Sequence, residues 1–346
     1  MCSSVVSDAP FQSKDDAKSL ISVILSTQTR GTKLRRLICF VRFVPQVCGV
    51  ESKTNPHPWL VTGAHGQLGA RLLWAAASRG EAAVGLGRAD LDITREEEVA
   101  RALDHHRPSL VLNTAAFTGV DAAESQQELA MAVNGHGVGI LARACALRGI
   151  PMVHLSTDYV FGEGARAPRQ PNDPVQPLGA YGKSKQAGEA QFLSSGVQGA
   201  VVRVSWLYDV EGRNFLTTML RLAKANGELK VVDDQWGVPT SAPLLAGALL
   251  DMASLGEKMP QGIWHYAHEG ATTWHGFACE IVALAGWDIP VHRMSTEEFP
   301  TAAERPQWSV LDGTALQKRM GWHGVPWQEA LKSSWNLRGD GGPLLR

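Results

Sequence analysis

The stretch WLVTGAHGQLG, running from Trp59 to Gly69, decides the fold. It opens with residues typical of a short buried strand, and the next segment, Ala70 to Ala77, consists of good helix formers. Between the two segments stand Gly63, Gly66 and Gly69. The first glycine can take a tight turn, the second lets the backbone approach a pyrophosphate, and the third lets the helix pack closely on the strand. The spacing is GxxGxxG rather than GxGxxG, but between a strand and a helix it predicts a dinucleotide site.

From Trp59 onward, short apolar runs alternate with helix-length segments. This alternation predicts an α/β fold with a doubly wound parallel sheet of the Rossmann type, whose ligands bind beyond the carboxyl ends of the strands. We expect one domain over residues 59–346, with a smaller C-terminal substrate lobe mainly in residues 207–240 and 262–335. The candidate parallel strands are Trp59–Thr62, Ala82–Leu86, Ser109–Asn113, Pro151–Ser156, Ala200–Ser205 and Leu229–Val232.

Composition argues against several other classes of protein. Of the 346 residues, 44% are apolar and 19% are charged, and the net charge is -1, so neither intrinsic disorder nor a nucleic-acid partner is expected. No apolar run approaches the roughly 20 residues of a membrane span. The cysteines form no CxxC pair, which favours reduced thiols in a cytoplasmic protein and gives no metal site; they are Cys2, Cys39, Cys48, Cys145 and Cys279.

Residues Met1 to Pro58 differ from the rest of the chain because they lack a sustained helical or strand period. We expect a poorly ordered N-terminal extension there. The apolar stretch Leu37 to Val50 is interrupted by Arg42 and Pro45, which is not typical of a signal peptide.

The end of the second candidate strand indicates which nicotinamide cofactor is bound. A dinucleotide site usually carries an acid about 20 residues after the glycines, where it binds the adenosine ribose. Here the strand ends in VGLGR, residues 84–88, without a carboxylate. A guanidinium matches the oxygens of a 2′-phosphate, so Arg88 favours NADPH, with NADH as the alternative. Asp90 and Asp92 follow closely enough to reach the adenine or the ribose.

The strongest chemical signal is the pair Tyr181 and Lys185 in the segment YGKSK. Residues four apart share a helix face, so the phenol and the ammonium can point at one ligand. A nearby cation lowers the pKa of a tyrosine, ordinarily about 10, and makes it a usable acid. Thr157, in the run STDYVFG after the fourth candidate strand, can hydrogen-bond the same carbonyl oxygen. These residues predict hydride transfer from a nicotinamide to a carbonyl carbon, with Tyr181 as proton donor and Lys185 also holding the nicotinamide ribose.

Longer segments carry a more specific resemblance. They are NTAAFTGVDAAE (113–124), LSTDYVF (155–161), PLGAYGKSKQAGE (177–189), RVSWLY (203–208), NFLTTMLRLA (214–223), VVDDQWGVPTSA (231–242), TWHGFA (273–278) and RPQWSVLD (305–312). With the glycine turn, they resemble the extended short-chain dehydrogenases/reductases and, within them, the dTDP-4-dehydrorhamnose reductase family. The resemblance runs from Trp59 to about Leu331 and leaves only the N-terminal extension outside.

The resemblance implies NADPH-dependent reduction of dTDP-6-deoxy-L-lyxo-4-hexulose to dTDP-L-rhamnose, with a dTDP-sugar as the partner. It implies that Thr157, Tyr181 and Lys185 are catalytic, that Asp158 lies near the substrate and that Trp206 packs on the sugar. It leaves open a homodimer and a magnesium ion, for which no ligand can be placed. Cofactor contacts are implied at Gly66, Gln67, Leu68, Asp92, Ile93, Ala115 and Ala116.

Two departures from the family pattern lie on the substrate side. The run GEG at residues 162–164 replaces the more usual Asp-Gly turn, and Asp209 stands where many relatives carry glycine. They put the choice of sugar in doubt, while the residues expected to direct hydride transfer are intact.

Two other functions stay open. A nucleotide-sugar epimerase or dehydratase would use the same fold, but dehydratases carry Asp-Glu after the threonine, whereas this chain has Asp158 followed by Tyr159. The other alternative is a non-catalytic NADP-binding subunit, similar to the regulatory subunit of methionine adenosyltransferase. The complete set of Thr157, Tyr181 and Lys185 with Trp206 favours a working reductase, and cofactor binding without turnover would favour the regulatory subunit.

Overall fold

The computed structural model describes residues 57–338, which all belong to one compact unit. The expectation of a poorly ordered extension at Met1 to Pro58 therefore lies outside the described residues, apart from its last two positions.

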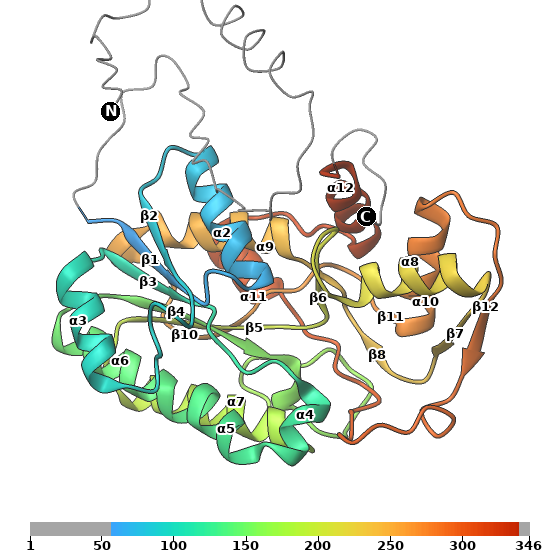
Figure 1. Ribbon diagram of the computed structural model, residues 1–346, viewed down its shortest axis with the longest axis horizontal. Coiled ribbons are helices and arrows are strands. Elements are labelled where there is room, and N and C mark those ends of the chain that lie inside the picture. Colours follow the sequence, from blue (N-terminus) through green and yellow to red (C-terminus); the bar gives the residue numbers. More distant parts are fainter. Residues whose placement is uncertain (1–56, 339–346) are drawn as a thin grey trace, which may run out of the picture. The chain divides into compact units, whose positions relative to one another are not determined.

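A six-stranded sheet with the order β10-β5-β4-β3-β1-β2 forms the centre of this unit (Figure 1). Every neighbouring pair is parallel, so the predicted doubly wound fold is confirmed. Because β1 pairs with β2 on one side and β3 on the other, the winding reverses at β1, where such sheets open a crevice for ligands. The strands are β1 (Trp59–Thr62), β2 (Ala83–Leu86), β3 (Leu110–Asn113), β4 (Met152–Thr157), β5 (Gly199–Val204) and β10 (Gly262–His265).

Helices cover both faces of the sheet, as Figure 1 shows. Alternate strand residues point to opposite faces, so Val61 packs with α2 and α9, whereas Leu60 packs with α3 and α6. The helices around the sheet are α2 (Gln67–Ser78), α3 (Glu96–His106), α4 (Val120–Ser125), α5 (Gln127–Met131), α6 (Val138–Leu147), α7 (Ala180–Ser194), α9 (Ala242–Ala253) and α11 (Thr314–Met320). Shorter helical turns are η1 (Ala132–Gly137), η2 (Asp158–Val160) and η3 (Gly256–Lys258).

One predicted strand of the sheet is wrong. Leu229–Val232 is a strand, β7, but it pairs with β12 outside the central sheet. The sixth place of the sheet belongs to β10, which pairs with β5. An apolar run shows that a segment can be a strand but not which strand it joins. The sequence of β10, GIWH, with a glycine and a histidine at its ends, gives a weaker signal than LKVV of β7.

A second, smaller group of elements has its own hydrophobic core, around Tyr208, Leu216, Phe277 and Trp327. We call this group the lobe, and it lies beside the carboxyl ends of the sheet strands in Figure 1. It contains β6 (Leu207–Tyr208), α8 (Phe215–Asn226), β7, β8 (Trp236–Gly237), β9 (Thr240–Ser241), β11 (Thr272–Thr273), α10 (Trp274–Leu284), β12 (Val291–Met294) and α12 (Trp327–Asn336).

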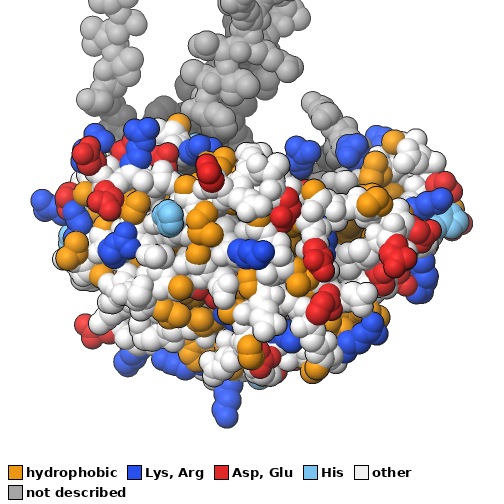
Figure 2. Space-filling model, turned by 90° about the horizontal axis from the view of Figure 1, so that it is seen from below, with side chains coloured by type: hydrophobic (Ala, Val, Ile, Leu, Met, Phe, Trp, Pro, Cys, Tyr) orange, Lys and Arg blue, Asp and Glu red, His pale blue; other side chains and the backbone are white. Residues whose placement is uncertain are grey.

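The surface seen from the side of α4, α5 and α7 carries acidic and basic side chains interspersed with one another (Figure 2). No patch of a single charge dominates that face. Of the helices within residues 57–338, none combines the length and apolar character needed to cross a membrane.

Candidate active site

A cavity of about 820 Å³ lies at the carboxyl ends of the strands, where the lobe meets the sheet. Its walls come from the turn after β1, the ends of β2, β3 and β4, helix α7 and the start of α8. With the exceptions of Gly69 and Asp90, every residue that the sequence proposed for the site lines this cavity. They are Gly63, Gly66, Gln67, Leu68, Arg88, Asp92, Ile93, Ala115, Ala116, Thr157, Asp158, Tyr181, Lys185 and Trp206.

The first of these exceptions, Gly69, lies behind the cavity wall. A Cβ atom at this position would stand 2.4 Å from the carbonyl oxygen of Gly63, so only glycine lets α2 pack this closely on the turn. Gly63 itself has a φ of +65°, and a Cβ there would lie 2.7 Å from the backbone nitrogen of Ala115. The turn after β1 and the chain after β3 are therefore in close backbone contact.

The start of α2 has the features of an anion site. Its N-cap is Gly66, which supplies no side chain to cap the helix. The first amides of a helix have no partner within the helix, and the helix dipole favours a negative charge beside them. The buried Nε2 of Gln67 also has no hydrogen-bond partner among the described residues. These groups fit the pyrophosphate of a dinucleotide.

The segment after β2 provides a cation at the rim of the cavity. Arg88 is exposed there, whereas Asp90 turns back and accepts a hydrogen bond from the backbone of Gly87 at 2.9 Å. Asp90 does not line the cavity, so Asp92 is the carboxylate of this segment that does. Hydrogen bonds from Thr94 lower the pKa of Asp92 and keep it ionised. Arg88 fits a phosphate and Asp92 fits a ribose hydroxyl.

Thr157, Tyr181 and Lys185 meet on one wall of the cavity. Thr157 ends β4, while Tyr181 and Lys185 lie one turn apart on α7. The Nζ atom of Lys185 donates to the carbonyl oxygen of Leu155 at 2.6 Å, which fixes the ammonium behind the strand end. Burial lowers the pKa of Lys185 to about 8.

The acidity of Tyr181 differs from the expectation. Burial raises its pKa to about 12, the charge of Asp158 adds to the rise, and a hydrogen bond with Thr157 opposes it. Desolvation disfavours the charged phenolate, and this rise in the pKa outweighs the lowering that was expected from the nearby Lys185. Tyr181 is therefore fully protonated at neutral pH, which is the state that a proton donor needs.

Asp158 is a buried carboxyl group with one unused oxygen. Its side chain is 2% exposed, and its Oδ2 has no hydrogen-bond partner among residues 57–338. The other oxygen, Oδ1, accepts from the hydroxyl of Thr157 at 3.0 Å. Burial raises the pKa of Asp158 to about 6, and the hydroxyl groups of Ser309 and Thr157 oppose this rise. Since a buried polar atom without a partner is costly, this oxygen is suited to bind a ligand hydroxyl.

Trp206 has a strained backbone and an aromatic neighbour. Its φ of +47° is in the left-handed region, which is rare for a large side chain and is often found at functional sites. Its ring stacks on that of Trp274 with centroids 3.5 Å apart, so one face of Trp206 is covered by protein. Trp274 belongs to a segment of the family resemblance, but its contact with Trp206 was not predicted, because only the folded chain brings α10 beside the end of β5. The cavity wall also includes four residues that were not proposed as site residues from the sequence: Phe117, Tyr159, Arg213 and Asn214.

Arg305, Pro239 and Thr240, which belong to segments of the family resemblance, do not line the cavity. Arg305 instead forms an ion pair with Asp121 at 2.8 Å. Within residues 57–338, no group of three or more His, Cys, Asp or Glu side chains is arranged to hold a metal ion.

Helix α7 is anchored to the sheet beneath the cavity. Glu189, two turns after Tyr181, forms a buried ion pair with Arg203 of β5, through contacts of 2.8 Å to Nε and 2.7 Å to Nη2. The hydroxyl of Ser156 donates to the same carboxylate at 2.5 Å. At the other end of α7, Glu124 accepts from the backbone nitrogen of Ala180 at 2.7 Å.

Comparison with known proteins identifies a family. The model of the RmlD substrate binding domain matches residues 58–337. A dTDP-4-dehydrorhamnose reductase of Burkholderia thailandensis is 40% identical over 290 residues, 79% of this chain and 96% of that protein. One from Streptomyces griseus is 44% identical over 266 residues, 75% of this chain and 87% of that protein. The crystal structure of a dTDP-4-dehydrorhamnose reductase from Bacillus anthracis in complex with NADP is similar, with a TM-score of 0.77, 33% identity and coverage of 81% of this chain and 99% of that one.

Proposed function

Because this chain belongs to the dTDP-4-dehydrorhamnose reductase family, we propose that it reduces the C4 keto group of dTDP-6-deoxy-L-lyxo-4-hexulose with NADPH and forms dTDP-L-rhamnose. The observation that carries the proposal is the meeting of Thr157, Tyr181 and Lys185 in the same cavity as the glycine turn after β1.

NADPH fits the sheet side of the cavity. Gly66, whose own amide donates to the carbonyl oxygen of Gly63, would let the backbone approach the pyrophosphate. The amides of Gln67 and Leu68 would hold the pyrophosphate, and Arg88 would hold the 2′-phosphate that distinguishes NADPH from NADH. Asp92 and Ile93 would contact the adenosine, Ala115 and Ala116 would lie along the ribose and pyrophosphate, and Lys185 would hold the nicotinamide ribose. When bound, the cofactor supplies a hydride to the carbonyl carbon.

The protein supplies the proton. Tyr181 donates its phenolic hydrogen to the carbonyl oxygen as the carbon becomes an alcohol carbon, and Thr157 hydrogen-bonds the same oxygen. Lys185, fixed by Leu155, stabilises the phenolate that remains on Tyr181 until a proton from solvent restores it. Because burial keeps Tyr181 protonated before the reaction, the proton is available over the physiological pH range.

The sugar would bind on the lobe side. The free oxygen of Asp158 would bind a sugar hydroxyl, and the uncovered part of the Trp206 ring would pack on the apolar face of the deoxyhexose. We place the reaction in the cytoplasm and regard a homodimer as the assembly to test.

An absorbance assay tests this proposal. The purified full-length chain should oxidise NADPH rapidly with freshly generated dTDP-6-deoxy-L-lyxo-4-hexulose, and more slowly with NADH or with a GDP-linked keto sugar. Tight binding of NADPH without turnover on any keto sugar would refute the proposal and favour the regulatory-subunit alternative.

A further inference from the structure

The connection between β6 and α8, residues 209–214, forms part of the cavity wall on the lobe side. Two of its residues, Arg213 and Asn214, line the cavity. The side chain of Arg213 is exposed, and it makes no hydrogen bond or ion pair with any other residue in the range 57–338. This connection therefore presents an unpaired guanidinium at the edge of the proposed active site.

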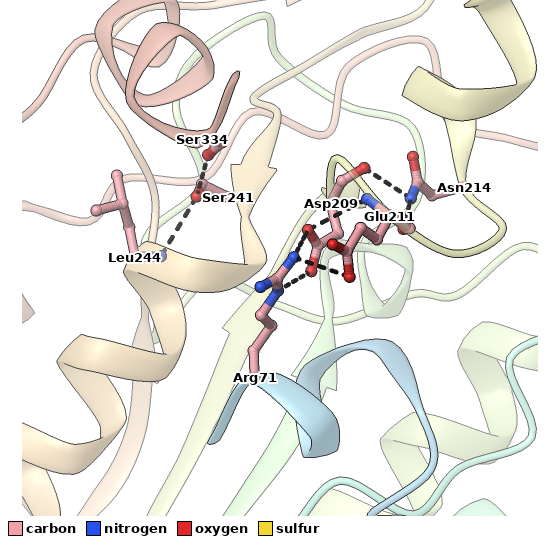
Figure 3. Close-up of polar contacts among 7 residues, drawn as sticks. All are labelled: Arg71, Asp209, Glu211, Asn214, Ser241, Leu244 and Ser334. Atoms are coloured by element: carbon pink, nitrogen blue, oxygen red, sulfur yellow. Dashed lines mark hydrogen bonds and ion pairs between the residues drawn. The ribbon is translucent and has the colours of Figure 1, made fainter. Parts of the chain in front are cut away.

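The connection is held firmly at its first residue. Asp209 is 3% exposed, and both of its carboxylate oxygens accept from Arg71 of α2, at 2.5 Å from Nε and 2.7 Å from Nη2 (Figure 3). This bidentate geometry is the strongest form of an arginine–carboxylate contact. Arg71 lies one helical turn after Gln67, so the ion pair ties the helix of the proposed pyrophosphate site directly to the lobe.

The connection is also fixed at its last residue. The Nδ2 of Asn214 donates to the carbonyl oxygens of Asp209 and Glu211, at 2.8 and 2.9 Å (Figure 3). Its Oδ1 accepts from the backbone of Thr217 and caps α8. Because both ends of the connection are held, the backbone of Arg213 has a defined place beside the cavity, and only its side chain is free to reach a ligand.

The charges around the cavity indicate which ligand that is. The other lysine and arginine side chains in the cavity wall are Arg88 and Lys185, which lie on the sheet side and are used by the cofactor in the proposed function. A nucleotide-linked sugar brings a diphosphate with two negative charges of its own. Arg213 is the remaining cation in the described wall, and it comes from the lobe, where the sugar nucleotide would lie.

We propose that Arg213 binds the diphosphate of the sugar nucleotide, and that the Arg71–Asp209 ion pair is the positioning contact that holds the connection carrying it. This inference rests on the proposed function, because the diphosphate belongs to its substrate. Arginine suits the role because its planar guanidinium can pair with two phosphate oxygens at once.

The test compares Arg213→Ala and Arg213→Lys with a matched control, Arg221→Ala, which removes an exposed arginine of α8 that does not line the cavity. For each variant, kcat and the KM of the keto sugar are measured, and the affinities for dTDP and for NADPH are measured by calorimetry. Arg213→Ala should raise the KM and weaken dTDP binding by about tenfold or more, the usual effect of losing a charge-assisted hydrogen bond. The affinity for NADPH should stay within about twofold of wild type. Arg213→Lys should recover part of the loss.

The positioning role of the Arg71–Asp209 ion pair is tested separately, by the KM of the sugar in variants of Asp209. Asp209→Asn should raise the KM of the sugar while kcat changes little, and combining it with Arg213→Ala should add little to the effect of Arg213→Ala alone. Purely additive effects would show that the ion pair does not act through Arg213.

The outcomes separate this inference from the proposed function. If the wild-type chain turns over the keto sugar while Arg213→Ala keeps the KM and the dTDP affinity of Arg221→Ala, the role of Arg213 is overturned and the proposed function stands. A loss of NADPH affinity in Arg213→Ala, with dTDP binding unchanged, also overturns it. A wild-type chain that neither binds dTDP nor oxidises NADPH with the sugar overturns both.

Discussion

Removal of the charge on Glu189 should destabilise the protein strongly, because it leaves Arg203 buried without its counter-ion. The two side chains are only 2% and 4% exposed, and the carboxylate receives hydrogen bonds from Arg203 and from Ser156. Breaking a buried ion pair on one side typically costs about 3–5 kcal/mol, since the remaining charge is neither hydrated nor paired. We expect Glu189→Gln to lower the free energy of unfolding by roughly 3 kcal/mol, because the amide keeps one acceptor for the guanidinium.

An exposed ion pair in the same chain provides the control. Arg79 and Asp251 meet at 2.7 Å, but their side chains are 40% and 45% exposed. Asp251→Asn should therefore cost less than about 1 kcal/mol. Both variants and the wild-type chain are compared by urea denaturation, followed by circular dichroism.

Replacing both residues of the buried ion pair with apolar residues should destabilise the protein less than removing the charge of Glu189 alone. The double variant Glu189→Leu/Arg203→Met removes both charges together, so it should recover much of the stability lost in Glu189→Gln. If Glu189→Gln costs no more than Asp251→Asn, the argument that burial makes this pair costly to break is refuted.

Three further predictions concern the cavity. Tyr181→Phe should lower kcat by about 10²–10⁴ and leave the affinity for NADPH nearly unchanged, and near wild-type turnover would contradict its role as the proton donor. Burial raises the pKa of Asp158 to about 6 in the folded chain, so its stabilising contribution is complete below the unfolded pKa near 3.9 and is lost as pH rises through 6. The stability of wild type relative to Asp158→Asn should therefore fall by about 2 kcal/mol between pH 4 and pH 7 in urea denaturation, and a constant difference would contradict this. Gly69→Ala should weaken NADPH binding in calorimetry, since the new Cβ would stand 2.4 Å from the carbonyl oxygen of Gly63. The control Gly247→Ala should leave the NADPH affinity unchanged, because its Cβ would lie 3.4 Å from the end of a flexible arginine side chain. Equal NADPH affinity in both variants would contradict this packing argument.

The central sheet could be predicted largely from the sequence because its strands carry strong local signals. The predicted strand Trp59–Thr62 agrees with β1, and the next four agree with β2 to β5 within a residue at each end. Each is a short apolar run between helix-length segments, which is the pattern that a parallel sheet buried on both faces imposes. The sixth strand could not be predicted: the sequence analysis placed β7 in the central sheet, but β10 occupies that position. Strand pairing depends on contacts between distant segments, which no local sequence pattern contains.

The features of the candidate site also fall into two groups, those that local sequence spacing predicts and those that only the folded chain reveals. Gly63, Tyr181 and Lys185 stand out because their chemistry requires fixed spacings along one turn or one helix. The stacking of Trp274 on Trp206 and the ion pair of Arg71 with Asp209 join segments far apart in the chain, and no spacing reveals them. The pKa of Tyr181 is higher than the sequence predicts for a related reason, since the sequence shows the neighbouring lysine but not the depth of burial.

Hydride transfer to C4 of the sugar is the central claim, and isotope labelling tests it most directly. The full-length chain is incubated with the dTDP-linked 4-keto sugar and NADPH that carries deuterium at the transferred position of the nicotinamide. The account predicts dTDP-rhamnose with a single deuterium at C4, detected by mass spectrometry and located by NMR. Oxidation of the cofactor without deuterium at C4, or no deuterated sugar at all, would contradict it.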